Sequence, residues 1–110
     1  MSSLFKNGHN VWALFLGHLV LEKLLKAIYV ENVKMNVPFT HDLTKIAEKA
    51  RLALTEEQKD LLDAVTTFNI KARYPDYKRK FYRTATKKFT ANYIKEIKDF
   101  RRWLLKRIRK

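Results

Sequence analysis

The stretch NVWALFLGHLVLEKLLKAIYVENV, residues 10–33, decides the fold class of this chain of 110 residues. Apolar side chains recur along it at spacings of three and four, which is typical of a helix that buries one face. Asn36 and Pro38 end the pattern, because the residue before a proline avoids helical backbone angles. The sequence therefore predicts a long first helix from about residue 10 to residue 33.

Polar and charged side chains interrupt this apolar stretch at His18, Glu22, Lys23 and Lys26. Each ionised group would cost about 2 to 3 kcal/mol at the centre of a bilayer. The start of the chain also has no long uncharged apolar run ahead of a small-residue cleavage site, which a secretory signal would need. We therefore expect a buried helix, no membrane association and a cytoplasmic protein.

Two shorter helices are expected next. Thr40 precedes the segment DLTKIAEKARLAL, whose apolar positions also recur at helical spacing. We therefore expect a helix of about three turns with Thr40 as its N-cap. Thr55 and Gln58 have the spacing of a capping box, which marks the start of a third helix. The apolar stripe of that helix ends near Pro75, where we expect the chain to break.

A fourth helix is expected from about Phe81 to the end of the chain, and its pattern is amphipathic. One face is apolar and consists of Phe89, Tyr93, Ile97, Phe100, Leu104 and Ile108. The opposite face is basic and consists of Lys88, Lys95, Lys98, Arg102, Lys106 and Arg109. Membrane-surface binding by this helix is disfavoured, because its apolar face is needed for the core.

Two glycines and two prolines are too few for an architecture rich in hairpins, and no segment alternates as a strand would. We expect an all-α fold, an antiparallel up-and-down four-helix bundle, as one domain over residues 1–110. The chain has no cysteine and three dispersed histidines, so we expect no metal site and no cofactor. It also has no glycine-rich phosphate loop and no serine or cysteine nucleophile within the helices.

The positive charge of the chain is concentrated in its last forty residues. Residues 1–70 hold eight basic and eight acidic side chains, whereas residues 71–110 hold sixteen basic and three acidic ones, which accounts for the net charge of +13. Localised charge of this size predicts a polyanion, an anionic membrane surface or an acidic protein as partner. The alternative is a basic face that only keeps the protein soluble.

Two groups of polar residues in the first half are candidates for a site. His18, Glu22 and Lys26 share one face of the first helix, which suggests a cleft or a subunit contact. The structural alternative pairs Glu22 with Lys26 and buries a hydrogen-bonded His18. His41 and Asp42 stand at the start of the second helix, where Asp42 is expected to act as a favourable charge at the positive helix end.

The third candidate is the corner around Pro75. Aromatic and guanidinium groups side by side suit bases and phosphates, although a structural pair of Arg73 with Asp76 is an equal alternative. The corner combines two tyrosines with a run of cations, and its candidate residues are Arg73, Tyr74, Asp76, Tyr77, Lys78, Arg79 and Lys80.

Three segments in this order resemble the HEPN family, whose name stands for higher eukaryotes and prokaryotes nucleotide-binding. They are HLVLEKLLKAIYVE at 18–31, PFTHDL at 38–43 and FNIKARYPD at 68–76. The resemblance implies a helical bundle that usually dimerises, that works beside a small nucleotidyltransferase or as a fused module, and that binds nucleotides or RNA.

Family members that cleave RNA carry an arginine four to six residues before a histidine. In this chain the first arginine, Arg51, follows the last histidine, His41, so that no histidine follows any arginine. The residues four to six positions after Arg73 are Tyr77, Lys78 and Arg79 instead. The ribonuclease motif is absent, which favours a protein that is not an enzyme.

The leading hypothesis is therefore a noncatalytic module that binds nucleotide or RNA, with a separate nucleotidyltransferase, in a toxin–antitoxin-like or stress and defence context. Tyr74 and Tyr77 would stack on a base, and His41 and Asp42 would line the same cleft. The expected phosphate contacts are Arg73, Lys78, Arg79, Lys80 and Arg83. One alternative is a divergent ribonuclease toxin that uses Tyr77 or His18, and another is an adaptor that binds an acidic protein.

Overall fold

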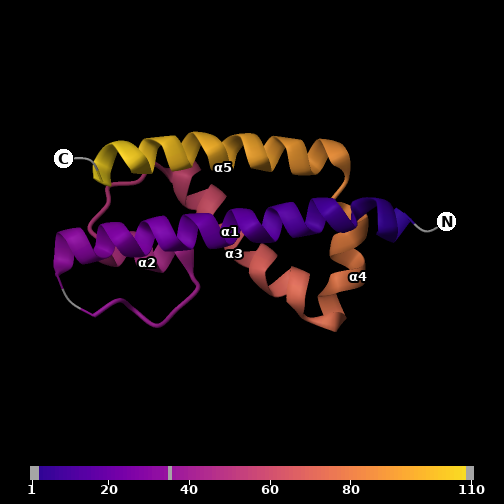
Figure 1. Ribbon diagram of the computed structural model, residues 1–110, viewed down its shortest axis with the longest axis horizontal. Helices are drawn as coiled ribbons and strands as arrows, with labels where there is room; N and C mark the ends of the chain where they lie inside the picture. Colours follow the sequence, from indigo (N-terminus) through magenta and orange to yellow (C-terminus); the bar gives the residue numbers. More distant parts are fainter. Residues whose placement is uncertain (1–2, 35, 109–110) are drawn as a thin grey trace.

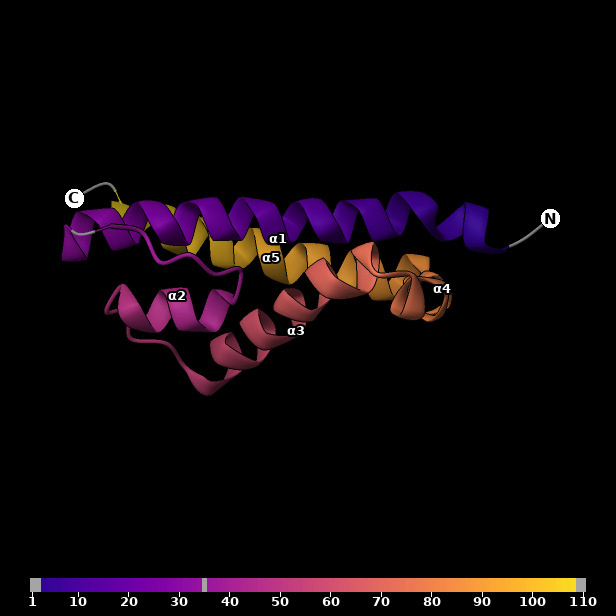
Figure 2. The ribbon, with the colours of Figure 1, turned by 90° about the horizontal axis from the view of Figure 1, so that it is seen from below.

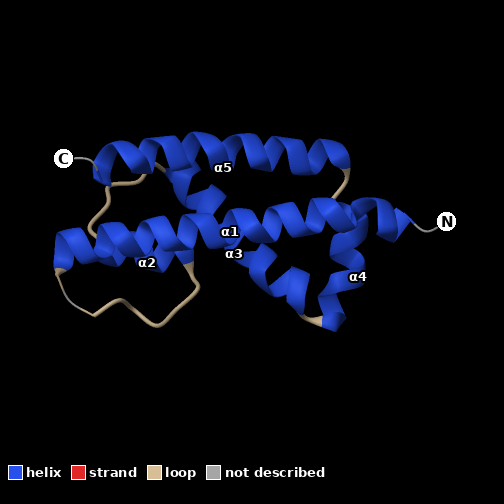
Figure 3. Ribbon diagram, in the orientation of Figure 1, coloured by secondary structure: helices blue, strands red, loops and turns tan. Residues whose placement is uncertain are grey.

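The computed structural model describes residues 3–34 and 36–108, with side chains from residue 8 to residue 107 apart from residue 35. In this part of the chain there are helices and loops but no strands (Figure 3). The all-α prediction is confirmed. The helices are α1 (Ser3–Val33), α2 (Leu43–Lys49), α3 (Glu56–Arg73), α4 (Pro75–Thr84) and α5 (Lys87–Ile108).

The predicted up-and-down four-helix bundle is only an approximation to this arrangement. Helices α1 and α5 lie side by side and run in the same direction (Figures 1 and 2). The connection after α1 returns along that helix before α2 begins, so α2 also runs with α1, whereas α3 runs back toward the start of α1 (Figures 1 and 2). The short α4 crosses the end of the bundle near the N-terminus (Figure 1).

The segment after Pro75 differs most from the sequence-based expectation. Pro75 ends α3, as predicted, but it also occupies the first turn of α4, so only Tyr74 separates the two helices. Proline is favoured at the first helical position because its missing N–H has no partner there to lose. The expected start of the last helix near Phe81 is therefore wrong: Phe81 lies in α4, and α5 begins at Lys87.

The first helix begins at Ser3 and not near residue 10, and of the two predicted N-caps one is confirmed and the other is wrong. The Thr55 hydroxyl accepts from the Gln58 amide while the Gln58 side chain accepts from the Thr55 amide, which confirms the capping box. The N-cap of α2 is Asp42, whose carboxylate accepts from the Lys45 amide at 3.2 Å. Thr40 instead accepts from the Asp42 amide, so it supports the cap rather than forming it.

The apolar face of α1 lies at the centre of the core and packs on all four other helices. Gly17 lets α5 approach closely, because a Cβ there would stand 2.8 Å from Ile97 Cδ1. Ile97, Phe100 and Leu104 are buried, so the predicted apolar face of α5 is confirmed over the described side chains. The Ile108 side chain and Arg109 lie outside the described residues.

Phe68 on α3 packs against aromatic rings of both helices that follow it. Its ring centroid is 5.3 Å from that of Phe81 on α4, and 6.1 and 5.1 Å from those of Phe89 and Tyr93 on α5. This aromatic cluster connects the end of α3 to both of the helices that follow it, and it therefore sets the position of the corner at Pro75. None of the described helices is long and apolar enough to span a membrane.

Candidate functional site

The buried carboxylate of Glu22 is the centre of a polar cluster between α1 and the start of α2. Lys26 Nζ donates to Glu22 Oε2 at 2.8 Å, and His41 Nδ1 donates to Glu22 Oε1 at 3.0 Å. His18 Nε2 donates to the backbone carbonyl of His41 at 2.9 Å. The expected pairing of Glu22 with Lys26 is present, and it extends to His41, which lies 19 residues away in sequence.

His18 is a structural histidine in this arrangement, since its side chain is fully buried. Its Nδ1 has no hydrogen-bond partner among the described residues and lies 3.7 Å from Glu22 Oε1. The described residues contain no group of histidines and acids that could hold a metal ion. The His18 ring is therefore enclosed by the described residues around it.

Burial lowers the pKa of His18 below its ordinary value of 6.5, although the hydrogen bond to His41 and the charge of Glu22 each raise this pKa. The positive charges of His41 and Arg73 lower this pKa further. Burial alone would raise the pKa of Glu22, but hydrogen bonds from Lys26 and His41 outweigh it and hold the pKa below 4.5. As pH falls through these ordinary values, the unfolded chain takes up protons that the folded chain does not, so both groups make the fold less stable in acid.

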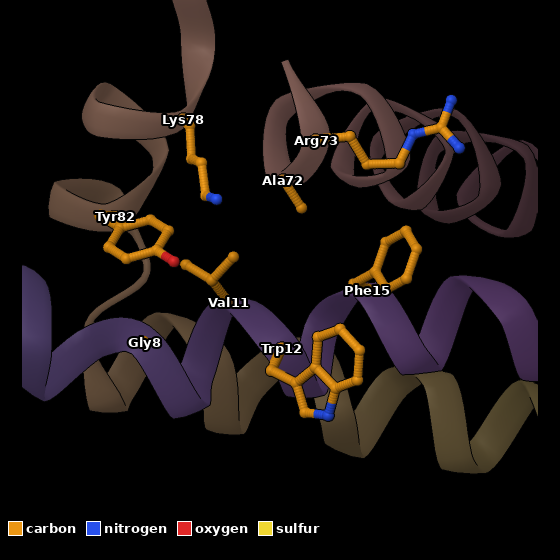
Figure 4. Close-up of a pocket in the computed structure, with 8 residues that line it drawn as sticks. All are labelled: Gly8, Val11, Trp12, Phe15, Ala72, Arg73, Lys78 and Tyr82. Carbon is orange, nitrogen blue, oxygen red and sulfur yellow. The ribbon is translucent and has the colours of Figure 1, made fainter. Parts of the chain in front are cut away.

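A pocket of about 320 Å³ lies between the first half of α1, the end of α3 and α4 (Figure 4). Its cationic groups are Arg73, the last residue of α3, and Lys78 on α4. Its walls are mostly apolar and aromatic, and the residues that line it are Gly8, Val11, Trp12, Phe15, Ala72, Arg73, Lys78 and Tyr82. A cationic pocket with aromatic walls suits an anionic ligand that has a planar part.

Arg73 and Lys78 thus share one pocket, but the other candidate residues of the corner do not line it. Arg79 lies with Pro75 in a neighbouring groove, and Tyr77 and Lys80 lie in another, beside Phe81. Tyr74 packs under the Arg73 guanidinium, whose Cζ is 5.7 Å from the ring centroid. Asp76 and Arg83 are exposed. These residues are neighbours in sequence at the corner, but helix α4 distributes them among different grooves.

His41 and Asp42 also stand apart from the residues that line this pocket. Asp42 is engaged as the cap of α2. The His41 side chain is 56% exposed and held by Glu22. The link between the two regions is electrostatic, because the charge of Arg73 adds to the lowering of the His18 pKa.

Trp12 and Tyr82 also line the pocket, although neither was predicted to be a site residue from the sequence. Trp12 is 59% exposed on a helix whose other face forms the core. An exposed tryptophan beside an apolar stripe was the available signal, but the sequence alone does not show that α4 crosses this end of α1.

In a comparison with known families, the family model of the HEPN domain matches residues 1–108. The chain belongs to the HEPN domain family. Searches among curated proteins and among solved structures found no match. Membership of the HEPN family indicates a module related to nucleotides or RNA.

Proposed function

We propose that this HEPN domain is a noncatalytic module that binds the phosphates of a nucleotide or RNA at the pocket between α1, α3 and α4. The observation that carries the proposal is the pair of cations, Arg73 and Lys78, at a pocket with aromatic walls. Three further exposed cations of α4, Arg79, Lys80 and Arg83, add to the positive field at this end of the molecule. Charged donors bind phosphate oxygens about twice as strongly as neutral donors do.

The charge of Arg73 is available for a ligand. No ion pair joins Arg73 to Asp76 in the described residues, although that pair was the structural alternative. The contact with the Tyr74 ring holds the guanidinium near the pocket without neutralising its charge. Tyr77 and Lys80 line a separate groove, where Tyr77 can stack on a further base of a longer RNA.

The noncatalytic part of the proposal rests on the missing Arg–His spacing and on the burial of His18. The biological part, drawn from the family, is a homodimer that acts with a separate small nucleotidyltransferase in a toxin–antitoxin-like or defence system. Light scattering on the isolated protein tests the dimer, for which the mass must be twice that of one chain. Co-purification with a nucleotidyltransferase encoded beside it tests the partner, and free elution of both proteins would contradict it.

The direct test of RNA binding compares the wild type with Arg73→Ala by fluorescence anisotropy of labelled single-stranded RNA over a salt series. We expect the variant to bind about tenfold more weakly, which corresponds to about 1.4 kcal/mol. The slope of log affinity against log salt should fall by about 0.7, because one phosphate contact is lost. Arg51→Ala removes the same charge at an exposed position beyond α2 and should leave both quantities near the wild type.

Equal affinities for the wild type and Arg73→Ala would contradict the assigned site. Cleavage of the RNA during the same titration, seen on a denaturing gel, would contradict the noncatalytic assignment and favour the ribonuclease alternative. Release of bound RNA by an acidic protein would instead favour the adaptor alternative.

A further inference from the structure

We infer that the pocket receives one unpaired nucleobase, which stacks on Trp12 while Lys78 and Arg73 hold the adjoining phosphate. The inference rests on the proposed function and deepens it, because it names the ligand class. The ligand is a nucleotide whose base is free of a complementary strand, either as a free nucleotide or within single-stranded RNA. The structural observations that carry it are the exposure of Trp12, the division of the pocket into two kinds of wall, and its size.

The first observation concerns the two aromatic rings on α1. Trp12 is 59% exposed, although its neighbours Val11 and Leu14 are buried in the core. Its ring is stacked on that of Phe15 from the next turn, with 5.6 Å between the centroids and 29° between the planes. Phe15 therefore supports the indole, and more than half of the Trp12 surface remains exposed. A supported, exposed indole is a platform for a further ring.

The second observation is the division of the pocket into an aromatic wall on α1 and a cationic wall across from it. Lys78 and Tyr82 occupy neighbouring turns of α4, and the Lys78 ammonium lies 6.0 Å from the centroid of the Tyr82 ring. Figure 4 shows the Lys78 side chain pointing from α4 into the pocket, toward Val11 and Tyr82, and the Arg73 side chain on the other side of the pocket, where it extends past Phe15. A nucleotide has the same two parts, a planar base and an anionic phosphate, joined by a sugar.

The third observation is the volume of about 320 Å³, which lies at the lower end of the range for small-molecule sites. A pocket of this size suits one nucleotide and not a base pair. In a duplex the bases are paired and stacked on each other, and extracting one of them has an additional cost. The geometry therefore selects against double-stranded RNA, whereas surface cations alone would bind it through its phosphates.

The natural tryptophans provide the test. The chain has two, and Trp103→Phe leaves Trp12 as the single tryptophan, which is excited selectively over the tyrosines, while keeping an aromatic ring against Phe100. This variant is titrated with adenosine 5′-monophosphate, with adenosine, with a short single-stranded RNA and with a blunt duplex. We expect quenching of Trp12 by the monophosphate or the single strand, at least tenfold weaker binding of adenosine, and no saturable quenching by the duplex. Saturation by the monophosphate identifies a free nucleotide as sufficient, and saturation by the single strand alone identifies an RNA segment.

A second variant measures the contribution of the indole. Trp12→Leu should weaken binding of the quenching ligand by about 5- to 150-fold, the range expected for one stacked base. Val20→Ala, at an exposed apolar position two turns along α1 and outside the pocket, is the matched control and should bind as the wild type does. Circular dichroism confirms that both variants are folded.

The outcomes separate this inference from the proposed function. RNA binding that depends on Arg73 but leaves Trp12 fluorescence and the Trp12→Leu affinity unchanged would overturn the inference and leave the proposed function standing. Duplex binding as tight as single-strand binding would also overturn it. Absence of binding by every probe in both fluorescence and anisotropy would overturn both.

Discussion

Phe68→Ala is expected to lower the free energy of unfolding by about 3 to 5 kcal/mol, the usual cost of truncating a buried phenylalanine. The Phe68 side chain is 2% exposed and contacts three other aromatic rings on α4 and α5. Its removal leaves a cavity at the point where α3, α4 and α5 meet. Because the same cluster positions the corner at Pro75, RNA affinity should fall together with stability.

Urea denaturation followed by circular dichroism measures this change. Phe39→Ala is the matched control, because Phe39 is fully exposed in the connection before α2 and its truncation should change the midpoint little. A loss below 1 kcal/mol in Phe68→Ala would show that the aromatic cluster does not hold these helices together.

Glu22→Gln is expected to lower the free energy of unfolding by about 2 to 3 kcal/mol at neutral pH. Charge-assisted hydrogen bonds contribute about 1.5 to 3 kcal/mol each, and the expected loss is less than the sum for two bonds because both partners keep some contact with water. The substitution keeps the shape of the side chain but removes the charge that binds Lys26 and His41. Glu31→Gln removes an exposed carboxylate from the same helix and should have little effect. Urea midpoints at pH 7.5 provide the comparison.

The same variant separates the two acid-sensitive groups. In the wild type, stability should decline as pH falls through 6.5, where His18 contributes, and again below 4.5, where Glu22 contributes. Glu22→Gln should lose the second decline and retain the first. Parallel curves for the two proteins below pH 4.5 would contradict the role assigned to the Glu22 carboxylate.

Much of the fold was predictable because its signals are local. The period of α1, the Thr55 capping box and the apolar face of α5 each involve residues within a few turns of one another. Pro75 shows the limit of such reasoning, because one residue ends α3 and begins α4. The sequence signal for a break was correct, but the same signal also permits a new helix.

The candidate site was less predictable, because its contacts are distant in sequence. His41 joins Glu22 across 19 residues, and Trp12 and Lys78 line the same pocket only because α4 crosses the start of α1. The charge of the corner was visible in the sequence, but the aromatic wall opposite it was not. Arg73 was selected for its tyrosine neighbours, and in the structure it also faces aromatic groups from α1.

The most direct test of the account is a titration of ¹⁵N-labelled protein with adenosine 5′-monophosphate and with short single-stranded RNA, followed by two-dimensional NMR. If the ligand binds in the pocket, the largest chemical-shift changes are expected at the Trp12 indole N–H and at the amides around Arg73 and Lys78, with smaller changes on α2. Shifts confined to the basic face of α5, or none at saturating ligand, would contradict the assignment of the pocket between α1, α3 and α4 as the binding site.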